Sequence, residues 1–217
     1  MDNRRFSNNL VLAGIFAAAV TLAGPAFAHH AMDGAIPATM AQGLITGVAH
    51  PVVGLDHFAF VIAVGLASAF LPGRMLLPLA FIAATIAGCL LKLAGVALPV
   101  AEFVIAASVI VVGALVMRGK PVSSSILIGL FAVAGLFHGS AYAAGIIGAE
   151  QSPLAAYLAG FAVVQYAVAV AAMLVVREVF KATAALSLET RLGGALVAGA
   201  GVAFLVENIE QVLLKAV

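Results

Sequence analysis

Six apolar stretches, separated by short turn-forming segments, constrain this chain more than any other feature of its sequence. Each stretch is long enough to cross a bilayer core of roughly 30 Å as a helix that rises about 1.5 Å per residue. Hydrophobic residues make up 65% of the sequence and charged residues 9%, which is too little charge to cover a soluble domain. The sequence therefore predicts an all-α membrane protein with six transmembrane helices, near residues 47–71, 75–94, 99–117, 123–147, 153–176 and 192–213.

The N-terminus has the features of a cleavable signal peptide. Arg4 and Arg5 form a positive region, and residues 10–22 form the apolar region that follows it. Residues 26–28 read Ala-Phe-Ala, which is a small-residue cleavage site. We therefore expect residues 1–28 to be removed, with an uncleaved anchor helix as the alternative.

The mature chain, residues 29–217, is expected to form a single six-helix transmembrane domain that begins at His29. If His29 lies outside, the loops on the inner side contain six basic residues and the outer side contains two. This asymmetry follows the positive-inside rule. It predicts a multi-pass protein of the bacterial inner membrane whose mature N-terminus is periplasmic. The inner residues are Arg74, Arg118, Lys120, Arg177, Lys181 and Arg191, and the outer ones are Lys92 and Lys215.

Composition and motifs exclude several classes of function. The formal net charge is +1 and there is no basic run, so nucleic acid is not an expected partner. The single cysteine, Cys89, allows no disulfide and no cysteine-based zinc site within one chain. Neither a GxxxxGK(S/T) loop nor an HExxH motif occurs, so we expect neither ATP-driven transport nor an enzyme. Abundant Gly and Ala permit tight helix contacts within one chain or in a homo-oligomer.

Ionisable residues within the apolar stretches gather in the outer half of the predicted bundle. A charged group in hydrocarbon costs about 2.5–3.5 kcal/mol even on insertion scales. Such groups are tolerated where they line a polar cavity or pair with one another. The simplest arrangement that meets this cost is a hydrated, acidic vestibule open to the periplasm, which would attract cations.

Two histidine motifs are the candidates for metal chemistry. The first is HPVVGLDH at residues 50–57, and on a regular helix His50 and His57 would share one face. Asp56 is expected to be a ligand or the acceptor of an imidazole N–H. The second motif contains His138, in the fourth stretch. Because neutral imidazole suits nickel, cobalt, copper and zinc, several histidines plus a carboxylate favour a divalent transition metal.

Other interpretations of these residues remain open. A single intramembrane histidine such as His138 is often a structural group that bonds a backbone carbonyl or a serine. Glu150 lies at the end of the fourth stretch, where a solvated interfacial role competes with metal binding. If residues 1–28 are removed, His29 would offer its α-amine and imidazole together as a chelate for a divalent metal.

At these residues the sequence resembles the HupE/UreJ family of membrane proteins. The resemblance rests on the signal peptide followed by His29, the HPxxGxDH motif at 50–57, the stretch from FHG to GAE at 137–150, and PLAAYLAGF at 153–161. It covers the whole mature chain in helix order.

The resemblance implies a secondary permease for nickel, or for cobalt in some members, that serves hydrogenase or urease maturation or cobalamin synthesis. Ni²⁺ or Co²⁺ is then the transported substrate, and no prosthetic group is implied. The sequence departs from the family pattern at Ala144, where a carboxylate is expected. The metal residues that the resemblance assigns are His50, Asp56, His57, His138 and Glu150.

The resulting hypothesis is uptake of a divalent metal from the periplasm through an intramembrane His/Asp site. Six spans divide as three plus three with inverted orientation, as in many alternating-access carriers. The histidine motifs then lie at equivalent positions in the first span of each half, the first and fourth spans, although the residues around them barely match. The alternatives are a metal-binding accessory or sensor protein for metalloenzyme maturation and an intramembrane haem or metal enzyme.

Overall fold

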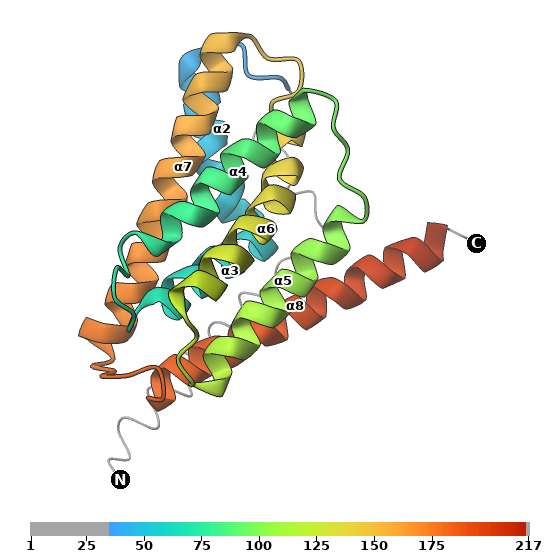
Figure 1. Ribbon diagram of the computed structural model, residues 1–217. Coiled ribbons are helices and arrows are strands. Elements are labelled where there is room, and N and C mark those ends of the chain that lie inside the picture. The colour runs from blue at the N-terminus through green and yellow to red at the C-terminus, as the bar shows by residue number, and fades with distance from the viewer. Residues whose placement is uncertain (1–34, 216–217) are drawn as a thin grey trace.

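The computed structural model describes residues 35–215, and the predicted signal peptide and His29 lie outside them. This part of the chain is all-helical, without strands, and forms one bundle (Figure 1). Its helices are α2 (Met40–Val53), α3 (Leu55–Ser68), α4 (Leu77–Leu93), α5 (Ala101–Arg118), α6 (Ser124–Tyr142), α7 (Gln151–Leu174) and α8 (Leu188–Lys215), with the short turns η1 (Ala143–Gly145) and η2 (Val175–Val179).

Several of these helices are long and apolar enough to cross a membrane. Four qualify by themselves: α5, α6 with η1, α7 with η2, and α8. The α2–α3 pair qualifies only as one bent unit, and α4 is a shorter apolar helix of 17 residues. The expectation of an all-helical, multi-pass membrane protein is thus confirmed, while the number of six spans stays a prediction.

The first predicted span is not one regular helix. It begins at Met40 rather than near residue 47, because Thr39 and Gln42 form a capping box there. Its two parts, α2 and α3, are bent by 78° at Gly54. Pro51 lies in the last turn of α2 and lacks the N–H that would continue the helical ladder, while Gly54 is extended with φ −71° and ψ 98°. The expectation that His50 and His57 share a face of one regular helix is therefore wrong.

Glycines bring the helices together in pairs at backbone distance. In the α2·α7 pair, a Cβ on Gly43 or Gly47 would overlap the carbonyl oxygen of Pro153 or Tyr157, respectively. In the α4·α6 pair, a Cβ on Gly139 would overlap the carbonyl oxygen of Thr85. These small residues let the backbones approach as closely as in other membrane helix pairs.

In the third helix pair, α5·α8, glycines also allow the two backbones to approach closely. A Cβ on Gly113 would overlap the backbone nitrogen of Ala198, and a Cβ on Gly194 would overlap that of Met117. The two helices run antiparallel, whereas α2 runs parallel to α7 and α4 runs parallel to α6 (Figure 1).

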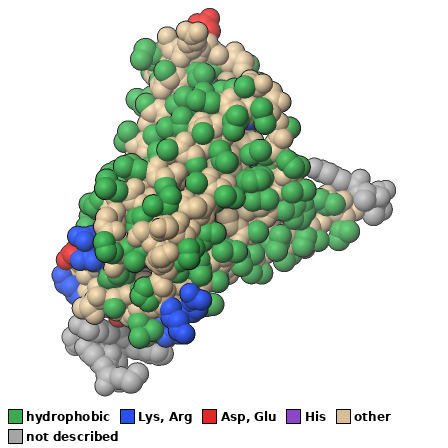
Figure 2. All heavy atoms as spheres, in the orientation of Figure 1, with side chains coloured by type: hydrophobic (Ala, Val, Ile, Leu, Met, Phe, Trp, Pro, Cys, Tyr) green, Lys and Arg blue, Asp and Glu red, His purple; other side chains and the backbone are tan. Residues whose placement is uncertain are grey.

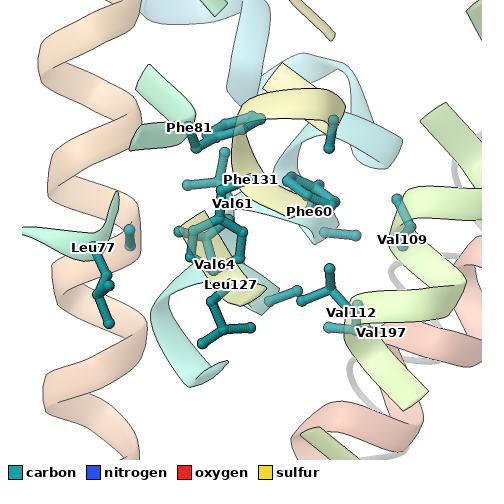
Figure 3. Packing of buried hydrophobic residues seen from close by; sticks show 14 of the residues in the cluster. Phe60, Val61, Val64, Leu77, Phe81, Val109, Val112, Leu127, Phe131 and Val197 are labelled. Atoms are coloured by element: carbon teal, nitrogen blue, oxygen red, sulfur yellow. The ribbon is translucent and has the colours of Figure 1, made fainter. Parts of the chain in front are cut away.

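Helix α3 lies among the three pairs and contacts α5, α7 and α8 most extensively. Its side chains form the centre of the main apolar cluster, as Figure 3 shows for Phe60, Val61 and Val64. Gly65 brings α3 against the backbone of α7 at Ala169. The bend at Gly54 thus lets α3 occupy the middle of the bundle while α2 stays beside α7.

Basic side chains mark one end of the bundle. They lie where α4, α6 and α8 begin and where α5 and α7 end, at the lower end of Figure 2. Hydrophobic side chains cover much of the visible sides of the molecule. We call this end the basic face, defined by Arg74, Arg118, Lys120, Arg177, Lys181 and Arg191, and we call the end where α2 and α7 begin the opposite face.

Candidate metal centre

The centre of the site is a pair of histidines from different helices. His57 lies in the first turn of α3 and His138 in the last turns of α6, 81 positions apart in the sequence. Their Nδ1 atoms are 2.9 Å apart, and their side chains are 2% and 0% exposed. The two histidine motifs thus each bring one imidazole to the same place between α3 and α6.

A serine on α5 fixes the tautomer of His138. The Ser108 hydroxyl donates its only hydrogen to the carbonyl of Ile105 at 2.7 Å, and its oxygen lies 3.1 Å from Nε2 of His138. If both contacts are hydrogen bonds, the Ser108 oxygen accepts from an Nε2–H of His138, and we assign this tautomer on that ground. A neutral His138 then has a lone pair on Nδ1, and His57 donates the Nδ1–H of the shared hydrogen bond.

A tyrosine on α7 orients His50 in the same way. The Tyr157 hydroxyl donates to the carbonyl of Tyr142 at 2.7 Å, and Nδ1 of His50 lies 3.2 Å from the same oxygen. His50 is therefore the donor to Tyr157, and a neutral His50 has its lone pair on Nε2. The His50 and His57 rings are stacked with centroids 5.9 Å apart. His50 thus continues the His57–His138 pair toward the opposite face.

Asp56 lies beside the pair at the beginning of α3. Its Oδ1 accepts the backbone N–H of His57 at 2.8 Å and lies 3.8 Å from Nδ1 of His57. A carboxylate in a first helical turn is favoured by the helix dipole and by free backbone N–H groups. Asp56 therefore has a structural function at the bend, and it is also close enough to add negative charge to the site.

The other predicted ligands are not brought into this cluster. Glu150 precedes α7 as its N-cap, is exposed, and lies at the opposite face. Within residues 35–215, no group of three or more His, Cys, Asp or Glu side chains is arranged to hold a metal ion. The site in this conformation is thus a histidine pair with Asp56 and His50 at its edge, rather than a complete coordination shell.

Sequence reasoning did not single out Ser108 and Tyr157. Ser108 is the only hydroxyl residue within α5, and an isolated serine in an apolar span was a usable signal for a polar partner. Tyr157 lay within the family-like segment but carried no motif of its own. Thr46 Oγ1 is a further buried polar atom without a hydrogen-bond partner among the described residues, and the buried hydroxyl of Tyr142 lies against the side-chain amide of Gln165.

Comparison with known sequences places the chain in a family. The family model described as "HupE / UreJ protein" matches residues 17–204, which is most of the sequence. The chain belongs to the HupE/UreJ family. The resemblance inferred from the histidine motifs is thereby confirmed, and both motifs lie within the matched range.

A curated relative extends this finding. Protein HupE of Rhizobium leguminosarum bv. viciae is 33% identical over 123 residues, which cover 56% of this chain and 63% of that protein. The match thus spans less than two thirds of the relative's length. No solved structure matches the chain.

Proposed function

We propose that this protein is a secondary permease for a divalent transition metal, nickel or cobalt, and that His57 and His138 hold the ion during passage. The observation that carries the proposal is the close approach of two buried imidazoles from separate helices, at a break in a membrane-spanning unit. Family membership supports it, since the HupE/UreJ family is associated with nickel or cobalt transport or metalloenzyme maturation.

The separation of the two imidazoles suits one cation. A metal–nitrogen distance of about 2.0–2.1 Å puts two nitrogens about 2.9 Å apart at a right angle and about 3.3 Å apart at the tetrahedral angle. The Nδ1 atoms are 2.9 Å apart, so a square-planar or octahedral ion needs no change in their separation. The proton that His57 shares with His138 must leave Nδ1 first, and binding therefore competes with a proton.

The broken span favours a cation in a second way. The bend at Gly54 turns the carbonyl end of α2 into the membrane interior, and such half-helix ends bind cations in other carriers. Asp56 supplies negative charge at the same level. Tyr142, whose ring contacts that of His57, brings a further buried hydroxyl to the same region.

Direction follows from the distribution of charge. Under the positive-inside rule the basic face is cytoplasmic and the opposite face, with Glu150, is periplasmic. The broken α2–α3 unit, α4 and the four long helices then make six spans in the bacterial inner membrane. The ion enters past His50, is held by His57 and His138, and leaves toward the basic face. A signal peptide over residues 1–28 and capture by His29 are compatible with this direction.

A haem enzyme is less well supported. Two histidines on opposite sides of one iron require nitrogens about 4 Å apart, since each bond is about 2 Å long. The observed 2.9 Å leaves no place for the macrocycle between His57 and His138. A metal-binding accessory protein is the alternative, and it differs in that metal uptake would not depend on it.

The proposal is tested by uptake of radioactive nickel and cobalt in cells that express the wild type or His57→Ala. We expect the variant to lose more than about tenfold in uptake, because even partners outside the first shell of a metal cost 10–100-fold when removed. Protein amount in the membrane is measured in parallel.

Val53→Ala provides the matched control. Val53 lies one turn before His57 at the same bend, and its side chain is exposed on the surface of the bundle. Its variant should take up metal at the wild-type rate. Equal accumulation in cells with His57→Ala, with wild type and without the protein would exclude the permease and favour the accessory function.

A further inference from the structure

The glycine contacts of two helix pairs follow the same pattern. In α2·α7, Cβ atoms on Gly43 and Gly47 and a Cβ on Gly160 would meet the carbonyl oxygens of residues 153, 157 and 44, respectively. In α4·α6, Cβ atoms on Gly135, Gly139 and Gly88 would meet the carbonyl oxygens of residues 81, 85 and 136. Every α2 position thus corresponds to the α6 position 92 residues later, and every α7 position to the α4 position 72 residues earlier.

The local sequences repeat with the contacts. GLITG at residues 43–47 corresponds to GLFHG at 135–139, and IAATIAG at 82–88 corresponds to LAAYLAG at 154–160. The α5·α8 pair completes the set, because GALV occurs at both 113–116 and 194–197. A Cβ on Gly113 would meet Ala198, and a Cβ on Gly194 would meet Met117. Gly194 and Ala198 lie 81 residues after Gly113 and Met117, respectively, so the two helices make the same contact on each other.

These correspondences define two repeats of three helices in the same chain order. The first consists of α2, α4 and α5, and the second of α6, α7 and α8. Because α2 and α6 run in opposite directions, the repeats are inverted (Figure 1). The shift falls from 92 to 72 residues between the first and second helices, so the connection between these two helices is 20 residues longer in the first repeat. These additional residues contain α3, which has no counterpart in the second repeat.

The glycine contacts also indicate which helices are held together rigidly and which can move relative to one another. Backbone-to-backbone glycine contacts occur within α2·α7, within α4·α6, within α5·α8, and between α3 and α7 at Gly65. Between the α2·α3·α7 unit and the α4·α6 unit, the contacts are made by side chains instead. They include the His57–His138 bond, the Thr85–Gln165 bond and the ring pairs Phe60–Phe81 and Tyr142–Phe161. Side-chain contacts of this kind can part and re-form, whereas interlocked backbones cannot slide without a clash.

The two faces differ where these units meet. At the basic face there is a cavity of about 210 Å³ between α3, α5, the α5–α6 loop and the start of α8, and Leu127 is the one lining residue that the α4·α6 unit contributes. Toward the opposite face, the rings of His50, Tyr142 and Tyr157 pack edge to face and close the junction. In the described conformation a cavity thus lies beside the junction at the basic face, whereas aromatic rings fill the junction toward the opposite face.

We propose that the chain is a duplicated, inverted three-helix repeat in which the α2·α3·α7 unit moves as one body against the α4·α6 unit, parting at the His57–His138 contact. This inference rests on the proposed transport function and adds its mechanism, which is alternating access rather than a continuous pore. Inverted repeats supply two conformations of similar energy, because each half can take the arrangement of the other. The alternate state closes the cavity at the basic face and opens the ring cluster around His50.

Two matched cross-links test which contacts move. The Tyr166 hydroxyl of α7 donates to the carbonyl of Met75, just before α4. Arg177, in the turn η2 that continues α7, donates to the carbonyl of Ala69, which directly follows α3. Cysteines at 75 and 166 therefore bridge the two units, and cysteines at 69 and 177 bridge positions within one unit. Both pairs are built in a Cys89→Ala background and closed with a bifunctional thiol reagent whose disulfides a reductant cleaves.

Bridging Met75→Cys/Tyr166→Cys should lower nickel uptake about tenfold or more, because one of two required states is removed. The reductant should restore it. Bridging Ala69→Cys/Arg177→Cys should leave uptake within about twofold. Undiminished uptake in the bridged 75/166 protein, or equal loss in both bridged proteins, would overturn the inference.

A second measurement does not require transport. Spin labels at the exposed positions Val133 on α6 and Val163 on α7 report the distance between the units, and labels at Val48 and Val163 report a distance within one unit. We expect the first distance to have two populations that nickel redistributes, and the second to have one. A single, unchanged distance for both pairs overturns the inference whether or not the protein takes up nickel.

Discussion

The α2·α7 and α4·α6 pairs are packed alike but carry different polar groups. By the shift of 92 residues, His138 on α6 corresponds to Thr46 on α2, and Tyr142 corresponds to His50. The histidine motifs therefore do not occupy equivalent positions in the two halves, contrary to the expectation from the sequence. The matching residues are the glycines and alanines that face the partner backbone. Packing between backbones tolerates no added methyl group, whereas a polar position can change its side chain once the helices are in place.

The largest loss of stability is expected from substituting glycines at corresponding positions of the α2·α7 and α4·α6 pairs. Gly47→Ala and Gly139→Ala each place a methyl group on a backbone carbonyl, and we expect each to destabilise the protein by about 1–3 kcal/mol. Thermal unfolding in detergent measures this. Gly129→Ala on α6 is the control, because nothing lies within 4 Å of its Cβ. Markedly unequal losses at Gly47 and Gly139 would break the equivalence of the two pairs.

Removing the polar side chains at the corresponding positions 138 and 46 should affect nickel uptake to different extents. His138→Ala should reduce nickel uptake more than about tenfold, since it removes one of two proposed ligands. Thr46→Ala removes one buried hydroxyl without a partner among the described residues and should change uptake by a few-fold at most. Uptake assays with both variants at matched expression measure this difference. Similar losses would mean that both positions bind the ion equally.

A smaller effect is expected at Ser108, which orients His138 without touching the other imidazole. Ser108→Ala should raise the nickel concentration needed for half-maximal uptake by about tenfold while leaving the amount of protein unchanged. Ser108→Thr keeps a hydroxyl and should restore most of the affinity. Ser68→Ala is the control, because the Ser68 hydroxyl also bonds its own helix, at Val64, three turns beyond His57. Equal affinities of Ser108→Ala and wild type would contradict the assigned tautomer.

Much of the fold could be predicted from the sequence because the membrane restricts the choice. Apolar stretches of this length can only be helices where no water is available for the backbone, and the turn-forming segments determine where they end. The family assignment also followed from local motifs, since HPxxGxDH is unusual in an apolar span. The main error of the sequence-based prediction was to expect one regular helix where the chain bends at Gly54. Pro51 and Gly54 each permit a break, but neither dictates that α3 turns by 78° into the bundle.

What the sequence by itself determined is the all-helical membrane character of the chain, the position of most of its helices and the histidines that chemistry singles out. Only the tertiary structure decided that His57 meets His138, that Ser108 and Tyr157 fix their partners' tautomers, and that Glu150 lies apart. The physical reason is that spacing along a chain gives neighbours only within one helix. Contacts between helices depend on which glycines allow two backbones to touch, and the bend then places α3 between those pairs.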